Sequence, residues 1–169
     1  MTGALVNEID WLMYLQEYRM VNNSITGTIP TQFGDLANLR VLELQKNDLI
    51  GEIPTEIYSA VSLEKLILDT NDLEGTISGL IGNLVAITDI GLSYTALNGK
   101  IPSGMDSLVN LQHLDVIATE LTGSIPPTTC ANIQSNGGTI VSPSSCPLFP
   151  FPLPGVFYCN CDGVCCKSK

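Results

Sequence analysis

The chain has 169 residues with 17 acidic and 7 basic side chains, and its formal net charge is −10. This charge argues against nucleic-acid binding, because phosphates attract clustered lysines and arginines, and it also disfavours contact with an anionic membrane. The sequence contains no run of about 18 or more apolar residues that could insert directly into a bilayer.

A glycine recurs at every twenty-fourth position, without insertion or deletion, along most of the chain: Gly3, Gly27, Gly51, Gly75, Gly99 and Gly123. An isoleucine stands two positions after each of the last five, and a proline follows it in four of these five copies. A fixed period in this range is typical of a solenoid. We number the repeats 1 to 5 after the glycines from Gly27 to Gly123.

Gly3 has the same register and predicts that the chain begins in the second half of a preceding repeat. The N-terminal residues are unlike a signal peptide, because Glu8 and Asp10 interrupt their apolar run and no basic region precedes them. Terminal repeats normally need a polar cap. We therefore expect a fragment, the C-terminal part of a longer protein that is membrane-associated in its full-length form and has its targeting signal or anchor upstream.

Each repeat is expected to contain one short strand and a compact return. Bulky apolar residues stand seven and nine positions before each glycine, for example Leu44 and Leu42, and a spacing of two places both side chains on one face of a strand. Other apolar residues stand twelve and fifteen positions before it, without a helical stripe. Stacked repeats can bury these residues as one continuous core.

The position four residues before the glycine is polar in every repeat: Asn23, Asn47, Asn71, Thr95 and Thr119. A buried amide can satisfy backbone groups that no strand partner reaches. Because a threonine hydroxyl does only part of this, we expect repeats 4 and 5 to be less rigid at this point.

Together these columns resemble the plant-type leucine-rich repeat, LxxLxxLxLxxNxLxGxIPxxL, as in VLELQKNDLIGEIPTEI and HLDVIATELTGSIPPTT. The resemblance covers residues 3–126. It implies an α/β-type repeat solenoid dominated by strands, a right-handed superhelix with a parallel sheet on its concave face and second short strands on a lateral face. We assign 1–126 to the solenoid, as five full repeats, and 127–169 to a Pro/Cys-rich C-terminal cap.

All six cysteines lie in that cap: Cys130, Cys146, Cys159, Cys161, Cys165 and Cys166. An even number in a loop-rich end predicts disulfides and an oxidising compartment, with connectivity left open. The resemblance also implies a disulfide-bonded cap. The alternative is a thiolate site for zinc or copper at 159–166. The intervening segment SPSSCPLFPFPLPGVFYC is rich in proline and is expected to cover the apolar end of the last repeat; otherwise it could be a ligand for an aromatic groove.

His113 is the single histidine and the main candidate for catalysis. The register places it on the concave face beside Asp115 and near Asp89, a set that could support acid–base chemistry or a weak metal site. A regular sheet implies no pocket, however, and we favour the interpretation of a solvated histidine on an acidic surface. We expect no enzymatic activity, no cofactor and no metal site. An ice-binding threonine array is not expected either, since hydroxyl pairs flank the glycine only in repeats 1 and 5.

The remaining strand positions vary between repeats while the core columns do not, as expected of a binding surface on a fixed frame or of neutral drift. The candidate ligand-binding residues of this concave face are Glu17, Arg19, Val41, Glu43, Gln45, Lys65, Ile67, Asp69, Asp89, Tyr94, His113, Asp115 and Ile117. Exposed apolar members, among them Val21, Val41 and Tyr94, favour a contact surface. Asn22 begins an N-x-S sequon and is a candidate glycosylation site.

We therefore expect a non-enzymatic module, extracellular or at the cell surface, that binds a protein, peptide or glycan through its concave or lateral face. The resemblance to receptor-like ectodomains and to secreted inhibitors of wall-degrading enzymes implies the same. The alternatives are a structural cell-wall or matrix protein that is cross-linked through its Cys-rich tail, and a metal-binding protein whose tail thiolates are the ligands.

Overall fold

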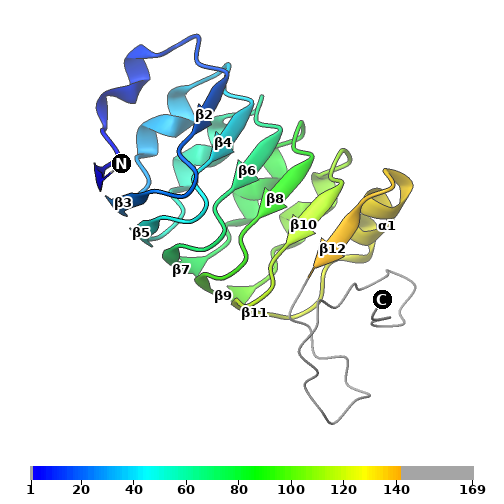
Figure 1. The fold of residues 1–169 in the computed structure, drawn as a ribbon. Coiled ribbons are helices and arrows are strands. Elements are labelled where there is room, and N and C mark those ends of the chain that lie inside the picture. The colour runs from blue at the N-terminus through cyan, green and yellow to red at the C-terminus, as the bar shows by residue number, and fades with distance from the viewer. Residues whose placement is uncertain (1, 142–169) are drawn as a thin grey trace.

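Strands from successive repeats stack in parallel along the computed structural model, which describes residues 2–141 (Figure 1). One set forms a six-stranded sheet with the helices behind it, which we call the concave sheet. Its strands are β2 (Glu17–Arg19), β4 (Val41–Glu43), β6 (Lys65–Ile67), β8 (Asp89–Gly91), β10 (His113–Asp115) and β12 (Thr139–Val141). From β2 to β10, paired residues are 24 positions apart, so each repeat continues the register of the one before.

A second six-stranded parallel sheet runs along the side of the stack, where the chain passes through the repeat glycines. Its strands are β1 (Thr2–Ala4), β3 (Ser24–Gly27), β5 (Asp48–Gly51), β7 (Asp72–Thr76), β9 (Ala96–Lys100) and β11 (Glu120–Thr122). The two sheets confirm the expected parallel concave sheet with second short strands beside it.

The return path of repeats 1 to 5 is a 3-10 helix behind the concave sheet. These helices are η1 (Glu8–Trp11), η2 (Thr31–Asp35), η3 (Thr55–Ser59), η4 (Gly79–Asn83) and η5 (Ser103–Ser107). A proline precedes η2, η3 and η5, whereas Ser78 precedes η4 and its Oγ accepts a hydrogen bond from Leu80 N at 3.2 Å. The serine thus replaces a fixed proline φ with a side-chain cap. None of the helices among residues 2–141 is long and apolar enough to cross a membrane.

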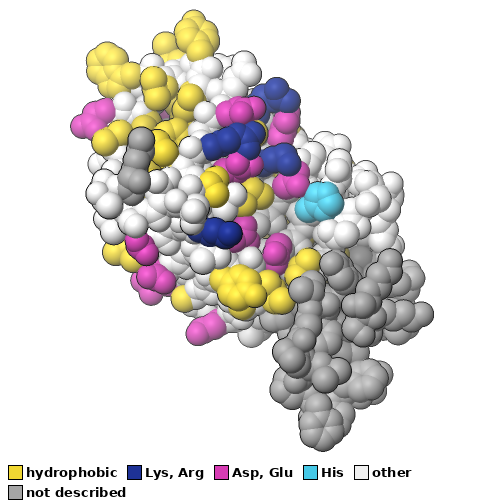
Figure 2. All heavy atoms as spheres, viewed as in Figure 1, with side chains coloured by type: hydrophobic (Ala, Val, Ile, Leu, Met, Phe, Trp, Pro, Cys, Tyr) yellow, Lys and Arg dark blue, Asp and Glu magenta, His cyan; other side chains and the backbone are white. Residues whose placement is uncertain are grey.

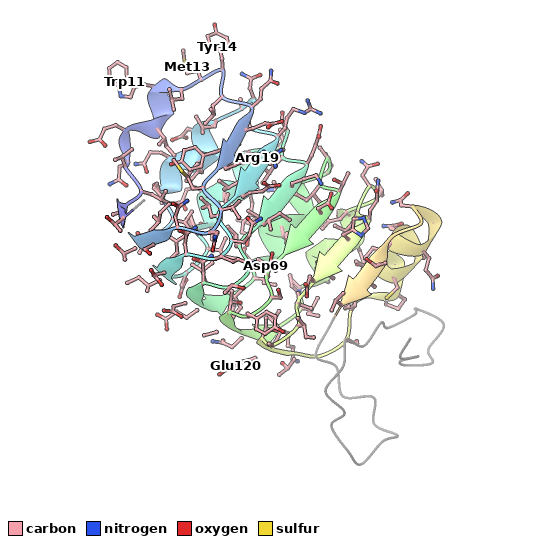
Figure 3. The ribbon with its side chains drawn as sticks, in the orientation of Figure 1. Trp11, Met13, Tyr14, Arg19, Asp69 and Glu120 are labelled. Atoms are coloured by element: carbon pink, nitrogen blue, oxygen red, sulfur yellow. The ribbon has the colours of Figure 1, made fainter. Side chains whose placement is uncertain are left out.

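The apolar columns predicted from the repeat form the core between the two faces. In repeats 2 to 5 their members are almost completely buried, as at Leu42, Leu66 and Leu114. The apolar residues of repeat 1 are less buried. Leu12, for example, is 48 % exposed, because η1 contacts a neighbouring helix only on the η2 side. Side chains at this end, including Trp11 and Tyr14, project outward (Figure 3).

The repeat glycines adopt a left-handed backbone, as expected from their position at a tight bend. At Gly75 φ is +82°, and a Cβ there would also lie only 2.7 Å from Glu52 Cγ. The sequence did not reveal that a second column has positive φ, five positions before the glycine. Its members, with φ between 51° and 60°, are Asn22, Lys46, Thr70, Tyr94 and Ala118. For L-residues this backbone is strained, above all for the β-branched threonine.

The buried asparagines connect neighbouring repeats through their amides. Asn71 Nδ2 donates to Leu44 O at 3.0 Å and to Leu68 O at 2.9 Å, while its Oδ1 accepts from Leu49 N at 3.1 Å. Asn47 makes the equivalent bonds one repeat earlier. Thr95 Oγ1 donates to Leu92 O, and within the described residues no side-chain bond from it reaches repeat 3. Thr95 therefore bonds a backbone carbonyl of its own repeat and does not form the hydrogen bonds to the preceding repeat that the asparagines form.

The solenoid extends beyond the boundary predicted at residue 126. A regular α-helix, α1 (Pro127–Ser135), packs against η5, and β12 adds a parallel strand to the concave sheet next to β10. Thr129, Ile133 and Ile140 are buried there. Residues 127–141 thus form a sixth repeat unit that covers the apolar end of repeat 5. The proline-rich segment, which we expected to do this, begins beyond the described residues.

The sixth repeat unit was not predicted because the spacing changes there. His113 pairs with Thr139, which is two positions later than the regular period would place its partner. The predicted disulfides mostly lie outside the described range. Cys130, in α1, is half-buried and has no disulfide partner among residues 2–141, and the other five cysteines follow residue 141.

Candidate functional site

The exposed side of the concave sheet has two halves of different chemistry. Over β2, β4, β6 and β8, basic and acidic side chains are intermixed, and the histidine lies beyond them towards the C-terminal end (Figure 2). Arg19 forms ion pairs with Glu17 and Glu43, and Lys65 Nζ lies 3.3 Å from Asp89 Oδ2. The carboxylates beside Arg19 raise the pKa of its guanidinium. Because the Arg19 and Lys65 side chains are partly exposed, solvent screens these pairs and they contribute little to stability.

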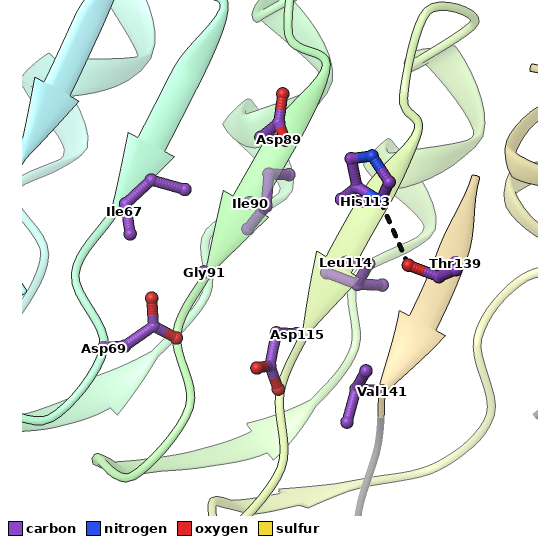
Figure 4. Close-up of a pocket in the computed structure, with 10 residues that line it drawn as sticks. All are labelled: Ile67, Asp69, Asp89, Ile90, Gly91, His113, Leu114, Asp115, Thr139 and Val141. Atoms are coloured by element: carbon purple, nitrogen blue, oxygen red, sulfur yellow. Dashed lines mark hydrogen bonds between the residues drawn. The ribbon is translucent and has the colours of Figure 1, made fainter. Parts of the chain in front are cut away.

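The C-terminal half has a hollow of about 240 Å³, where we expected none in a regular sheet. It spans four strands, from β6 to β12, and its floor lies over β8 and β10 (Figure 4). Its lining consists of Ile67, Asp69, Asp89, Ile90, Gly91, His113, Leu114, Asp115, Thr139 and Val141. Apolar side chains and carboxylates therefore share one concave site.

Gly91 opens the hollow. In the sheet it pairs with Ile67 on one side and Asp115 on the other, so a side chain is missing from the middle of a row of three. A Cβ at this position would overlap Asp69 Oδ2, which shows how closely the carboxylate occupies the space above the glycine. A larger residue here would fill the floor of the site and displace Asp69.

Two carboxylates flank Gly91 and are held by neutral donors (Figure 4). Ser93 donates to Asp69 Oδ1 from both its backbone N–H and its hydroxyl, and the Ile117 N–H donates to Asp115 Oδ1 at 3.1 Å. Among residues 2–141, no ion pair joins Asp69 or Asp115 to a basic side chain.

Burial raises the pKa of the Asp115 carboxyl above its usual value, and the negative charge of Asp69 adds to this. The hydrogen bond from the Ile117 N–H acts in the opposite direction and does not cancel the effect of burial. The site thus concentrates negative charge in a partly desolvated position, where an incoming cation would gain most.

His113 stands at the rim of the hollow, but its nearest polar contact is with Thr139. Its Nδ1 lies 3.0 Å from Thr139 Oγ1, and no described hydrogen bond or ion pair joins the ring to Asp89 or Asp115. The expected grouping on one face is therefore correct, while an acid–base contact is not present. Within residues 2–141 no set of three or more His, Cys, Asp or Glu side chains is placed to hold a metal ion.

The other predicted residues divide by exposure. Tyr94 is 61 % exposed at its left-handed turn, and Ile67 and Ile117 are half-buried beside the hollow. Val41 was wrongly expected to be exposed: it is 5 % exposed, because the long side chains of Glu17 and Lys65 flank it in register.

Two further predicted residues lie at the other end of the concave face. Gln45 is half-buried, and its Oε1 is buried without a hydrogen-bond partner among the described residues. Asn22 is exposed at the edge of repeat 1.

Sequence reasoning missed three contributors to the site. Thr139 and Val141 were assigned to the cap, and Gly91 was regarded as one variable position among many. A detectable signal did exist, since Thr139-Ile140-Val141 is a β-branched run that follows a pair of glycines, which is typical of a strand. The site depends on that added strand, because β12 supplies the wall beyond β10.

Exposed valines also recur at the turns between the 3-10 helices and the concave strands. Val61, Val85 and Val109 are 52 %, 52 % and 58 % exposed and occupy the same column of successive repeats. These three residues form a regular apolar row without charged residues, which we call the valine row. It is a second exposed apolar surface that a ligand could contact in place of the concave face.

Comparisons with known proteins agree with the repeat pattern. The family model "Leucine Rich Repeat" matches residues 38–60. A search of curated protein sequences found no match. Among solved structures, the plant peptide hormone receptor RGFR1 in complex with RGF2 is 33 % identical, with a TM-score of 0.78. The match covers 83 % of this chain and 22 % of the receptor chain, so this chain spans less than a quarter of that relative.

Two further structures are similar over most of this chain. A plant ice-binding protein is 30 % identical with a TM-score of 0.68, over 76 % of this chain and 41 % of its own. The leucine-rich repeat ectodomain of the receptor kinase SOBIR1 from Arabidopsis thaliana is 30 % identical with a TM-score of 0.69, over 74 % of this chain and 68 % of its own. With its regular repeat register, its two parallel sheets and these relatives, the chain belongs to the plant-type leucine-rich repeat proteins.

Proposed function

We propose that the chain is a non-enzymatic recognition module, extracellular or at the cell surface, that binds a peptide or a peptide segment of a protein through the C-terminal half of its concave face. The hollow over Gly91 carries this proposal, because the regular sheet departs from a uniform surface there. The peptide class is supported by RGFR1, a peptide hormone receptor whose structure contains RGF2.

The surroundings of the hollow suit a peptide ligand. Tyr94, Ile67 and Ile117 offer apolar contact area next to the carboxylates, and an aromatic or apolar centre with polar groups around it is typical of binding interfaces. The N-terminal half over β2 and β4 is different, since Arg19 there is already paired with Glu17 and Glu43. An extended peptide could therefore gain more over β6 to β12 than over β2 and β4.

Glycosylation of Asn22 is proposed as part of the same arrangement. The residue is exposed and lies in repeat 1, away from the hollow. A glycan there would shield the N-terminal half and leave the C-terminal half free. A mass decrease after treatment of the secreted protein with an N-glycosidase, absent in Asn22→Gln, would support this modification.

The similarity to an ice-binding protein does not yield a second candidate function. Flat ice-binding surfaces require a repeated side chain, and the residue just before the repeat glycine differs along the lateral sheet: Thr26, Ile50, Glu74, Asn98 and Thr122. The proposed roles of the tail, in cross-linking or metal binding, depend on cysteines outside the described residues.

Peptides selected on the immobilised protein from a random display library provide the test. We expect Asp89→Lys with Asp115→Lys to weaken binding of the selected peptides by at least about tenfold, and the melting temperature of the variant shows that it is folded. The control is Asp48→Lys with Asp72→Lys, which changes the charge equally at exposed positions of the lateral strands. Equal weakening by both pairs, or selection of glycans and no peptides in a parallel glycan array, would contradict the proposal.

A further inference from the structure

We infer that the hollow over Gly91 takes the basic side chain of the bound ligand, arginine in preference to lysine, with its cationic end between Asp69 and Asp115. This inference rests on the proposed function and specifies the chemistry of its central contact. The argument depends on the charge, the size and the lining of the hollow.

Charge complementarity is the first reason. Of the three carboxylates at the hollow, Asp89 already has a cationic partner in Lys65, whereas Asp69 and Asp115 accept hydrogen bonds only from uncharged donors among the described residues. Asp69 belongs to repeat 3 and Asp115 to repeat 5, and they lie on either side of Gly91 in repeat 4 (Figure 4). The negative charge of Asp69 disfavours the ionised form of Asp115. A cation placed between the two carboxylates relieves this repulsion for both.

The size of the hollow limits what it can hold. At about 240 Å³ it lies below the range of roughly 300–1,000 Å³ that is usual for complete small-molecule ligands. Its lining comes from four neighbouring strands of the concave sheet, so a single side chain could enter from a backbone that runs across these strands. A side chain of a peptide fits this description better than a free metabolite.

The lining explains the preference for arginine. Ile67 and Val141 are half-buried on opposite sides of the hollow and can pack against an aliphatic stem. A guanidinium has five donors in a planar fork and is less strongly hydrated than an ammonium group, so it can bond two separate carboxylates in a partly dry site. Ser93 and Ile117 hold both carboxylates in place before the ligand arrives.

The test uses the full chain and two short probes, the capped tripeptide acetyl-Gly-Arg-Gly-amide and its analogue with citrulline, which has nearly the same shape but no charge. Backbone amide signals of Ser93 and Ile117 report on the site by NMR, because these N–H groups donate to the two carboxylates. We expect saturable shifts of both signals at millimolar arginine probe. The citrulline probe should bind at least about tenfold more weakly, since charge-assisted hydrogen bonds are about twice as strong as neutral ones.

Four variants separate local charge, shape and general electrostatics. Asp69→Asn and Asp115→Asn remove charge at constant size, and Gly91→Ala fills the floor and displaces the Asp69 carboxylate without changing the net charge. Each should weaken the arginine probe by about tenfold or more, while Asp72→Asn on the lateral sheet should not. The melting temperature of each variant confirms that it is folded.

The inference is overturned if citrulline binds as well as arginine, if Asp72→Asn weakens binding as much as the site variants, or if no saturable shift occurs at Ser93 and Ile117. Its failure can be distinguished from failure of the proposed function. If library peptides bind the concave face without a basic residue and tolerate Asp69→Asn and Asp115→Asn, the recognition function stands and the arginine site does not. If library peptides bind only the lateral or convex surfaces, the proposed function fails whatever the probes do.

Discussion

The Asp69 carboxylate accepts two hydrogen bonds from Ser93, one from the backbone N–H at 2.7 Å and one from the hydroxyl at 2.6 Å. The two residues are 24 positions apart and occupy equivalent places in repeats 3 and 4. Ser93 is only 4 % exposed, whereas Asp69 is half-buried at the wall of the hollow. A buried side chain of one repeat thus positions an accessible carboxylate of its neighbour.

Ser93→Ala should therefore destabilise the protein and loosen the site. Loss of a hydrogen bond to a charged group costs about 1.5–3 kcal/mol in the free energy of unfolding, measured by urea denaturation. The exposed substitution Ser59→Ala should change it by less than about 0.5 kcal/mol. An unchanged stability in Ser93→Ala would mean that the Asp69 carboxylate is not held by this hydroxyl.

Asp115→Asn should affect stability in a pH-dependent direction. The raised pKa means that the native state holds this proton more tightly than the unfolded chain. The contribution is favourable below the unfolded value of about 4 and is lost as pH rises through the folded pKa, so at neutral pH the carboxylate is a net cost. The variant should gain stability relative to the wild type at about pH 7, and the difference should shrink towards about pH 4.

Urea denaturation at the two pH values measures this difference, with Asp72→Asn as the correction for losing one negative charge from an acidic protein. The assignment would be wrong if Asp115→Asn were less stable than the wild type at neutral pH and equal to it in acid. That result would show that the carboxylate is stabilised, not strained, by its surroundings.

Tyr58 should make the protein sensitive to alkali. Burial raises the pKa of its phenol to about 12, although a hydrogen bond with the backbone of Ser78 opposes the shift. Because the unfolded phenol ionises near pH 10, stability that is complete below pH 10 is lost between about 10 and 12, by up to about 2–3 kcal/mol. Denaturation curves at about pH 9 and about pH 11.5 should show a steeper loss in the wild type than in Tyr58→Phe. Parallel losses in both proteins would exclude Tyr58 as the source.

Asn71→Ala should be among the most damaging single changes in the solenoid. It leaves Leu44 O, Leu68 O and Leu49 N without their buried partner, at a cost of about 2–4 kcal/mol. Asn83→Ala, at an exposed position in η4, is the control. A loss no greater than that of the control would contradict the inter-repeat role of the amide.

Thr95→Asn tests the same role in the opposite direction. The new amide occupies the equivalent place one repeat later, within reach of the backbone groups that correspond to those bonded by Asn71. We expect a gain of about 1 kcal/mol in the free energy of unfolding, together with slower amide exchange at Leu73 N. A destabilised variant with unchanged exchange would show that repeats 3 and 4 do not accept this link.

The sequence allowed the scaffold to be predicted because every apolar column recurs with one period, and a fixed period with strand spacing has few structural solutions. The end of the solenoid was not predictable in this way, since β12 follows β10 at a longer spacing than the repeat and comes after a regular α-helix. Near that end, the one sequence signal for the added strand was the local β-branched run Thr139-Ile140-Val141.

The candidate site was only partly predictable. Its carboxylates were identified from the register, because concave positions are fixed once the core columns are known. The hollow depends on an absent side chain at Gly91 and on a strand contributed from beyond the regular repeats, neither of which a single column reveals. The predicted exposure of Val41 was wrong for a related reason. Whether a residue of the concave sheet is exposed depends on the length of the side chains on the neighbouring strands, here Glu17 and Lys65.

Amide hydrogen exchange of the protein with and without a library-selected peptide tests the central proposal most directly, because it locates the bound surface without any substitution. The account predicts slower exchange in 65–70, 89–94, 113–118 and 139–141, with the 3-10 helices and the lateral strands unchanged. Protection confined to η2–η5, to the valine row or to β3, β5 and β7 would contradict it.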